Sequence, residues 1–321
     1  MKITVAICTW NRCALLKETL EQVSRLAIPI GVEWELLVVN NNSTDATHDV
    51  LTTFASRLPL RVVLESKPGL SNARNRAVRE ATGSYILWTD DDVLVDQEWL
   101  AAYCEAFERW PDAAIFAGNI KPWFEGKPPE WLERVWPEVA TAYASRDIGE
   151  QAFPLSRDVL PFGANFAVRS SEQRKYLYDP DLGVRPGSII GGEETTVIKN
   201  MLADGVTGWW VPAARVRHHI PAARQTISYL RKYFKGYGEY CAVENADPNE
   251  ARLFGMPRWI MREAVTAEAR YQFRKHYAPP EVWIKDFIVS SLAWGQLGAF
   301  REGRKPKTAE QNGTGNKNEM I

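Results

Sequence analysis

The stretch YILWTDDDVLV, Tyr85–Val95, places three consecutive aspartates directly after an apolar run. The run is short and rich in large apolar side chains, as in a strand that is buried on both faces of a parallel sheet. Burying neighbouring carboxylates without a partner is costly, so such a triplet stays in water or binds a cation. Asp90, Asp91 and Asp92 therefore form either a solvated turn that caps a following helix or a site for Mg²⁺ or Mn²⁺.

Similar apolar runs recur before the aspartates, and segments with helical periodicity separate them. The predicted strands are Ile3–Cys8, Trp34–Asn40, Leu60–Glu65 and Ser84–Thr89, and the predicted helices are Ala14–Leu26, Asp45–Leu58 and Ser71–Thr82. This alternation predicts an α/β fold with a doubly wound, mostly parallel sheet flanked by helices. Ligands of such sheets bind beyond the carboxyl ends of the strands, where this chain is polar throughout. That edge is the predicted active site.

The second half of the chain has weaker signals. Further strands are predicted within 113–120, 162–170 and 207–221, and a helix at 191–205. The stretch 121–138 is rich in Trp and Pro and is predicted to be a long loop that forms a lid or a substrate wall. The predicted domains are a catalytic domain at 1–223, a helical extension at 224–300 and a disordered tail at 301–321.

Composition excludes several classes of protein. The 321 residues include 39 basic and 40 acidic ones, so the formal net charge is -1 and no global field recruits nucleic acid. The four cysteines lack the paired spacing of a zinc site or a disulfide framework, which favours a reducing, cytoplasmic location. The apolar segment Asp286–Phe300 is shorter than the roughly 20 residues that span a bilayer. Peripheral contact with the inner face of the cell membrane remains an option.

Five motifs, in order, resemble those of the family 2 glycosyltransferases with the GT-A fold. They are VAICTWNR, VVNNNSTD, KPGLSNARNRAV, TDDDV and GGEETT, and the resemblance covers Lys2–His219. TDDDV is similar to the family's D-x-D motif, and GGEETT to its GED motif. The resemblance implies transfer of a hexosyl or N-acetylhexosaminyl group from a nucleotide sugar, usually UDP-linked, with inversion at the anomeric carbon. The implied cofactor is Mn²⁺ or Mg²⁺.

The resemblance also implies roles on the donor side. Asp92 would bind the metal that neutralises the leaving diphosphate, while Asp90 would face the ribose or the sugar, with Asp91 beside it. His218 or His219 would be a further metal ligand, and only one of them can face the metal because neighbouring residues of a strand point in opposite directions. The other reading is a histidine that is merely buried or solvated.

Five more residues are implied to contact the nucleotide. Arg74 would lie near the diphosphate or the base, where a guanidinium binds two oxygens at once. Thr9 and Asn11 would meet the base or the ribose, unless they only form a turn. Asn40 and Asn41 stand where the family has acidic residues that accept the imide N–H of the base. An Asn amide accepts such a bond but also donates, so the preference for UDP is open.

The acceptor side is implied by the second acidic motif. Glu194 matches the family's catalytic aspartate and would be the general base, with Glu193 beside it. Gly192 would let the backbone approach the substrate, and Asn165 lies on the strand that would border the acceptor. The acceptor would be a growing cell-surface glycan or a lipid-linked sugar.

Two other classes of function, a non-catalytic binding module and an oxidoreductase, can be compared with these motifs. A module that binds nucleotide sugars or glycans without catalysis would keep the sheet but lose the base, and Asp92 with Glu194 argue against it. A dinucleotide oxidoreductase is excluded because CTWNRC contains no glycine. The stripe Tyr229, Tyr233, Phe234 and Tyr237, flanked by Arg231, Lys232 and Lys235, indicates a helix that binds a membrane surface, packs on its own domain or forms a homodimer.

Overall fold

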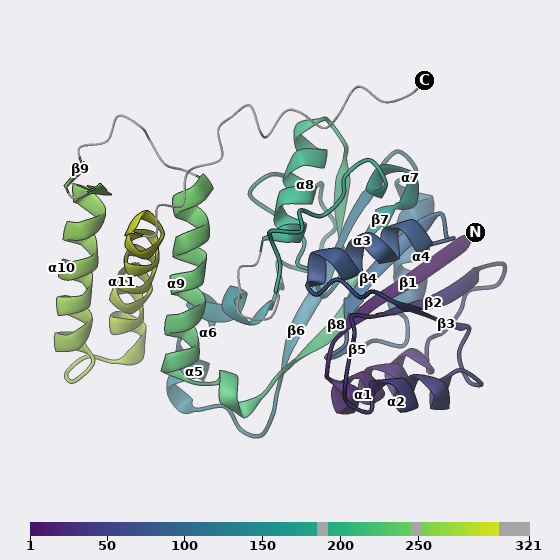
Figure 1. Ribbon diagram of the computed structural model, residues 1–321, viewed down its shortest axis with the longest axis horizontal. Coiled ribbons are helices and arrows are strands. Elements are labelled where there is room, and N and C mark those ends of the chain that lie inside the picture. The colour runs from purple at the N-terminus through teal and green to yellow at the C-terminus, as the bar shows by residue number, and fades with distance from the viewer. Residues whose placement is uncertain (185–191, 245–251, 254, 302–321) are drawn as a thin grey trace. The chain divides into compact units, whose positions relative to one another are not determined.

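The computed structural model describes residues 1–184, 192–244, 252–253 and 255–301 (Figure 1). Its contacts divide the chain into two compact units. The sheet unit comprises Met1–Lys127 and Tyr143–Pro221, and the helical unit comprises Pro128–Ala142 and the described residues from Ala222 onward. The sequence analysis did not anticipate that 128–142 join the later helices, and its domain boundaries stay a prediction.

A sheet whose described part has eight strands forms the centre of the sheet unit. The strands are β1 (Lys2–Thr9), β2 (Glu33–Asn40), β3 (Leu60–Leu64), β4 (Tyr85–Asp90), β5 (Val93–Val95), β6 (Ile115–Phe124), β7 (Phe166–Arg169) and β8 (Gly208–Ile220). Their order across the sheet is β3-β2-β1-β4-β7-β6-β8-β5. Neighbours pair in parallel except at β7, which is antiparallel to β4 and β6, and at β5, which is antiparallel to β8. The predicted α/β fold with a mostly parallel sheet is confirmed.

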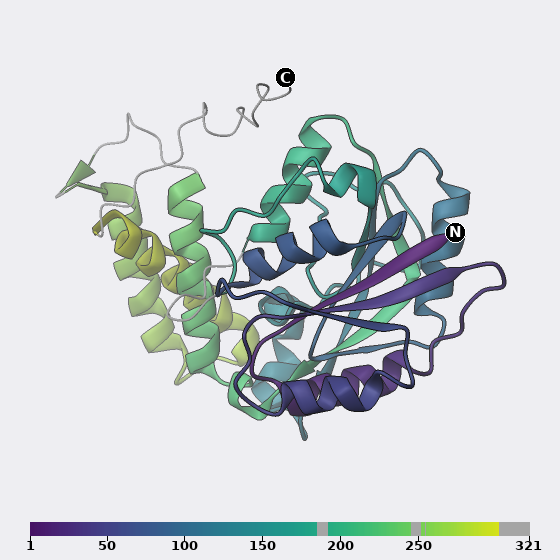
Figure 2. The ribbon, with the colours of Figure 1, turned by 45° about the vertical axis from the view of Figure 1, so that its right-hand side comes forward.

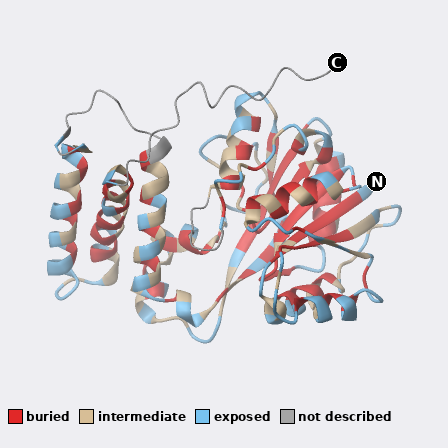
Figure 3. Ribbon diagram, viewed as in Figure 1, coloured by how far each residue is buried: buried red, intermediate tan, exposed pale blue. Residues whose placement is uncertain are grey.

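Helices cover both faces of this sheet. Alternate residues of β1 enter two separate cores, with Val5 and Ile7 in one and Ala6 in the other. The first core includes residues of α1 (Cys13–Val23), α2 (Thr47–Phe54) and α4 (Trp99–Arg109), and the second includes residues of α3 (Leu70–Glu80) and α8 (Glu193–Ala203). Figure 2 shows α1 and α2 on one side of the strands and α3 on the other. Figure 3 shows that the strands are buried through most of their length.

The predicted elements in the first half lie within a few residues of the observed ones, whereas the predicted loop at 121–138 is wrong for most of its length. Strand β6 runs on to Phe124 because it pairs in parallel with β8 as far as Ile220. Beyond it, α5 (Glu130–Arg134) and α6 (Trp136–Val139) are short helices of the helical unit. Trp and Pro content had marked the segment as irregular, although Pro at the first turn of a helix is well tolerated.

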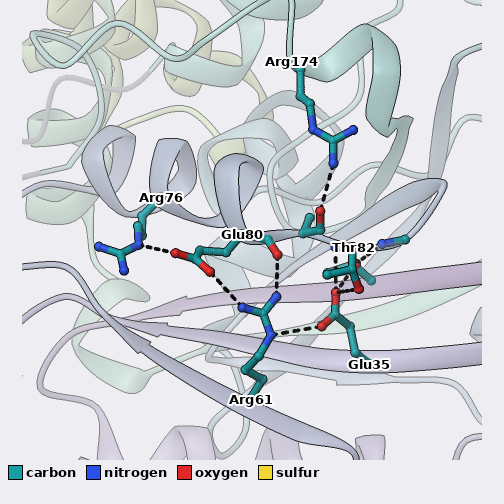
Figure 4. A network of polar contacts seen from close by, with 9 residues as sticks. Glu35, Arg61, Arg76, Glu80, Thr82 and Arg174 are labelled. Carbon is teal, nitrogen blue, oxygen red and sulfur yellow. Dashed lines mark hydrogen bonds and ion pairs between the residues drawn. The ribbon is translucent and has the colours of Figure 1, made fainter.

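A polar network fastens α3 to the sheet (Figure 4). Glu35 of β2 accepts hydrogen bonds from Thr4, Thr82 and Arg61, and Arg61 also donates to Glu80 near the end of α3 at 2.9 Å. Burial alone would raise the pKa of Glu35, but these hydrogen bonds outweigh it and hold the pKa at about 2. The network sets the position of the helix that carries Arg74.

The helical unit contains α9 (Ile227–Glu244), α10 (Arg258–Arg274) and α11 (Pro280–Arg301), so the predicted helical extension is confirmed. A short hairpin of β9 (Arg252–Leu253) and β10 (Met256–Pro257) precedes α10. Helices α9 and α11 approach closely at Gly238 and Gly295, where a Cβ atom would collide with the backbone of Leu292 and Lys235 respectively. Only glycine permits this contact.

Helix α9 uses much of its aromatic and basic stripe inside the helical unit. Tyr229 donates its hydroxyl to the carbonyl oxygen of Ala142 at 3.0 Å, Phe234 is buried, and Arg231 donates to Glu268 at 2.8 Å. These contacts contradict a lipid-facing role for the three side chains. In the described residues no helix is both long and apolar enough to cross a membrane. The predicted disordered tail lies outside the described residues, apart from Arg301.

Candidate active site

The aspartate triplet lies where β4 ends and β5 begins. The side chain of Asp90 is 31% exposed, whereas Asp91 and Asp92 are buried. Helix α4 begins only at Trp99, after Glu98, and no side chain caps its first turn. The alternative of a solvated turn that caps a helix is therefore wrong. The triplet is a buried acidic group with one accessible member.

Arg12 holds two of these aspartates together. Its Nη1 donates to Asp91 Oδ1 at 2.9 Å and to Asp92 Oδ2 at 2.8 Å. The hydroxyl of Thr9 donates to Asp91 Oδ2 at 2.7 Å, so both carboxylate oxygens of Asp91 are engaged by the protein. Burial raises the pKa of Asp91 to about 7, although the charge of Arg12 opposes this shift. Thr9 and Asp91 thus help to hold the site together, and their contact with substrate stays a prediction.

The sequence analysis missed Arg12, although it belongs to the polar segment after β1. A cation close behind a strand end, on the same edge as three aspartates, was the available signal. Its partner could not be chosen from the sequence, because the distance between residues 12 and 91 along the chain says nothing of their distance in space.

His218 faces Asp92. Antiparallel pairing of β5 with β8 places Val93 opposite His218, and the imidazole Nε2 lies 3.4 Å from Asp92 Oδ1. The ring Nδ1 is 2.8 Å from the carbonyl oxygen of Tyr143, so Nδ1 carries the proton and Nε2 of the neutral ring keeps its lone pair. Burial lowers the pKa of His218 and the charge of Asp92 raises it, with a raised pKa as the net result.

His219 is on the other side of β8 and packs on an aromatic ring. Its imidazole centroid lies 4.8 Å from that of Trp123. The question of which histidine faces Asp92 is thus answered in favour of His218, as the strand geometry requires.

Arg74 joins the triplet to the second acidic motif. Its side chain is 3% exposed, with Nη2 at 3.7 Å from Asp90 Oδ1 and Nη1 at 3.4 Å from Glu193 Oε1 and 3.7 Å from Glu194 Oε2. Nη1 makes no hydrogen bond. Gly163 lies against the guanidinium, where a Cβ atom would collide with Nη2. The guanidinium therefore sits between carboxylates of β4 and α8.

Helix α8 begins at this guanidinium. Gly192, in the left-handed conformation at φ 98°, precedes Glu193, and only glycine adopts this conformation without strain. Glu193 is buried and Glu194 is more accessible, with 5% and 18% of their side chains exposed. Burial and the nearby charge of Glu194 raise the pKa of Glu193 to about 8 against the opposing effect of Arg74. Gly191 lies outside the described residues.

The predicted asparagines near the base site mostly bind the protein itself. Asn11 Oδ1 accepts the backbone N–H of Thr44 at 2.7 Å, and Asn40 Oδ1 accepts that of Ser43 at 2.8 Å. The amide of Asn41 donates to the carbonyl oxygens of Glu65 and Lys67 and accepts the N–H of Gly69. Asn41 thus orders the loop before α3, and its contact with the base stays a prediction. Asn11 and Asn40 shape the turns of the same edge.

Asn165 does not line the site. Its side chain is fully buried, its Oδ1 accepts from Trp99 Nε1 and from the Tyr103 hydroxyl, and its Nδ2 donates to the carbonyl oxygens of Asn119 and Ala214. Every hydrogen-bonding position of the amide is used. The prediction of contact between Asn165 and substrate is therefore wrong, and Asn165 instead locks β7 to β6, β8 and α4.

The site has a surplus of negative charge. The acidic cluster, defined as Asp90, Asp91, Asp92, Glu193 and Glu194, contains five carboxylates and contacts two guanidiniums, those of Arg12 and Arg74. Among the described residues no group of three or more His, Cys, Asp or Glu side chains is arranged to hold a metal ion. Two atoms that could act as metal ligands do lie close together, namely Asp92 Oδ1 and His218 Nε2.

The spacing of these two donors fits one divalent cation. They are 3.4 Å apart, and two ligands that each lie about 2.1 Å from one ion at a right angle are separated by about 3 Å. Mg²⁺ is commonly held by one or two carboxylates together with phosphate oxygens of a substrate. A site with two protein ligands beside an accessible carboxylate is therefore suited to a cation that arrives with a diphosphate.

Comparison with known proteins gives the family. Residues 4–157 match the family model described as Glycosyl transferase family 2. The succinoglycan biosynthesis protein ExoM of Rhizobium meliloti is 23% identical over 245 residues, which cover 72% of this chain and 71% of ExoM. The next relatives are matched over less than half of their own length.

Solved structures share the fold. TarS 1–349 of S. aureus in complex with UDP-GlcNAc aligns with a TM-score of 0.51 at 15% identity and covers 95% of this chain and 93% of that one. The mannosyltransferase PcManGT of Pyrobaculum calidifontis in complex with GDP-Man and Mn²⁺ aligns with a TM-score of 0.53 at 18% identity and covers 94% and 74%. Residues 4–157 therefore form a family 2 glycosyltransferase domain, and the chain has the GT-A fold.

Proposed function

We propose that the protein is an inverting glycosyltransferase that moves a hexosyl or N-acetylhexosaminyl group from a UDP-sugar to a glycan or lipid-linked acceptor. One observation carries the proposal: Asp90, Asp92 and His218 on one side, and Glu193 and Glu194 on the other, meet at one edge of the sheet around Arg74. A group that stabilises a leaving diphosphate and a group that accepts a proton are both required for transfer, and this edge has both.

On the donor side, Asp92 and His218 would hold Mn²⁺ or Mg²⁺. The cation would neutralise charge on the diphosphate as it leaves. Arg12 keeps Asp92 oriented, with one carboxylate oxygen bound to the guanidinium and the other directed at His218. Asp90 is the accessible member of the triplet and would accept hydrogen bonds from hydroxyl groups of the ribose or the sugar.

On the acceptor side, Glu194 would be the general base. It is more accessible than Glu193, and both lie in the first turn of α8, where the helix dipole favours the ionised form. As the acceptor oxygen bonds to the anomeric carbon, its proton passes to Glu194 and the bond from that carbon to the diphosphate breaks on the opposite face. Attack from the face opposite the leaving group inverts the configuration.

The similarity to ExoM supports a role in cell-surface polysaccharide synthesis, since ExoM is a succinoglycan biosynthesis protein. The structural neighbours were solved with UDP-GlcNAc and with GDP-Man and Mn²⁺, so both bases occur with this fold. We favour UDP because the family that the five motifs resemble usually takes its sugar from a UDP-linked donor. A cytoplasmic location is part of the proposal and is supported by four cysteines that lack the paired spacing of a disulfide framework.

Calorimetry tests the donor half of the proposal. UDP is expected to bind in the presence of Mn²⁺ and to bind at least about tenfold more weakly in EDTA, because the acidic cluster repels an unneutralised diphosphate. GDP is the matched comparison for the base. Equal affinity in EDTA would exclude the metal site, and tighter binding of GDP would overturn the choice of UDP.

A donor screen separates the enzyme from a module that only binds nucleotide sugars. Hydrolysis of one nucleotide sugar with Mn²⁺, in the absence of acceptor, is the expected result for the enzyme. Tight, metal-dependent binding with no hydrolysis or transfer from any donor would favour the non-catalytic alternative.

A further inference from the structure

The outward face of α10 has an unusual composition for a surface helix. Its inward face consists of Ile260, Ala264, Ala267 and Tyr271, which recur at intervals of three or four residues and are buried. Such a helix normally exposes polar residues on the opposite side. Here the opposite side is apolar and aromatic over much of its length.

Four large apolar side chains form a stripe on that face. Trp259 is 51% exposed, Val265 59%, Phe273 69% and Tyr277, in the turn after the helix, 79%. At 100° per residue Trp259, Phe273 and Tyr277 fall within about 40° of one another, and Val265 lies about 80° from Phe273. The rings of Phe273 and Tyr277 are 5.2 Å apart. We call these four residues the α10 stripe.

Cations outnumber carboxylates beside the stripe. Arg258 and Arg262 are exposed on the same side of the helix, and in the described part of the chain neither has an ion pair. Arg270 and Arg274, by contrast, both pair with Asp286 at 2.8 Å. Glu263, one turn after Trp259, borders the stripe and is only partly exposed, and Glu268 is partly exposed and pairs with Arg231. The face thus combines aromatic rings with unpaired positive charge.

We propose that the α10 stripe docks the protein on an anionic lipid surface, with α10 lying flat in the interface. Aromatic rings bind at the boundary between headgroups and acyl chains, and arginines beside them attract acidic headgroups. The proposal is independent of the catalytic one. It differs from the sequence-based prediction, which assigned the membrane face to α9, whose Tyr229, Phe234 and Arg231 are used internally.

A second copy of the chain fits this face less well. A two-fold dimer sets the same patch against itself, so the surplus of arginines over Glu263 on one copy would meet the same surplus on the other. An acidic lipid surface satisfies the cations and the rings together. Because the formal net charge of the chain is -1, the attraction must be local to this face and sensitive to salt.

Vesicle co-sedimentation of the full chain tests the proposal. The probes are phosphatidylcholine vesicles with and without about one third phosphatidylglycerol, at low and high salt. The protein is expected to pellet with the anionic vesicles at low salt and to remain in the supernatant with neutral vesicles. The variant Phe273→Ser/Tyr277→Ser should bind about tenfold or more weakly. The matched control Ile30→Ser/Leu177→Ser, which changes two exposed apolar residues of the sheet unit, should bind as the parent does.

A charge variant keeps the test valid if the aromatic variant fails to fold. Arg258→Gln/Arg262→Gln should lower binding to anionic vesicles by about fivefold per arginine. Circular dichroism checks the fold of every variant, and sedimentation velocity without lipid checks self-association. The proposal is overturned if the parent does not pellet, if neutral vesicles bind it equally, or if the folded variants bind as well as the parent. A dimer that the stripe variants dissociate, without lipid binding, would assign the face to a second copy.

Discussion

Carboxylates outnumber their arginine partners at the edge of the sheet, whereas the ion pairs described in the helical unit contain the two in equal numbers. The acidic cluster has five carboxylates for the two guanidiniums of Arg12 and Arg74. In the helical unit Asp286 meets both Arg270 and Arg274, while Glu268 meets Arg231 and Glu281 meets Arg134. Glu130 also lies 4.0 Å from Arg134, so four carboxylates there contact four guanidiniums.

The pKa values follow the same division. Burial raises the pKa of Asp90, Asp91 and Glu193. Burial also acts on Glu268, but hydrogen bonds from Ser290, Gln272 and Arg231 outweigh it and lower its pKa. Charges that are balanced within the fold serve stability, whereas an unbalanced buried cluster costs stability and is retained where a ligand supplies the missing charge.

The largest effect is expected for Asp92→Asn. The change removes one of the two donors that converge with His218, so Mn²⁺ binding measured by calorimetry should be lost and turnover should fall by about 10³. The control is Asp286→Asn, the same substitution in the helical unit, which should leave both unchanged. Mn²⁺ binding by Asp92→Asn at the affinity of the parent would show that the acidic cluster is not a metal site.

The next largest effect separates the two glutamates of α8. Glu194→Gln keeps the shape of the side chain and removes its basicity, so turnover should fall by about 10² or more while UDP affinity is retained. Steady-state kinetics and calorimetry measure the two quantities. If Glu194→Gln retains turnover and Glu193→Gln loses it, the buried member of the pair is the base.

Stability in EDTA should depend on pH in opposite senses for Glu193 and Glu268. The pKa of Glu193 is raised from 4.5 to about 8, so the folded state binds more protons between these values and stability falls as pH rises through them, by at most about 1.4 kcal/mol per pH unit. Glu193→Gln should flatten this slope in urea unfolding.

Glu268 provides the matched comparison. Its folded pKa is lowered from 4.5, so its contribution is present above that pH and is lost as pH falls below it. Glu268→Gln should therefore weaken the protein at neutral pH and flatten the acid limb instead. If the free energy of unfolding depended on pH in the same way in both variants, the proposed difference between carboxylates of the acidic cluster and those of the helical unit would be wrong.

The smallest effect is expected for Asp286→Asn itself. Asp286 is buried and bridges two half-exposed arginines, so its neutralisation should lower the free energy of unfolding by about 1–2 kcal/mol. Urea unfolding of the full chain measures this. If Asp286→Asn changed the free energy of UDP binding more than the free energy of unfolding, Asp286 would have a role in ligand binding.

Much of the sheet unit was predictable because its signals are local. Apolar runs rich in branched side chains predicted β1, β2, β3 and β4 to within a residue or two, and the position of polar residues after each run predicted the edge where ligands bind. Stretch 121–138 was less predictable, since its fold depends on pairing between β6 and β8 and on helices far along the chain.

The sequence by itself determined the α/β fold, the family resemblance and the segments that carry Asp90, Asp92, Glu194 and His218, because periodicity and motif order survive without coordinates. Only the tertiary structure decided which polar groups remain available for a ligand. The side-chain amides of Asn165 and Asn41 make hydrogen bonds to backbone groups of the protein, and Arg12 binds aspartates 79 and 80 residues away. The physical reason is that a hydrogen bond is satisfied by whichever partner is near in space, and that proximity is created by packing between strands and helices that are remote in sequence.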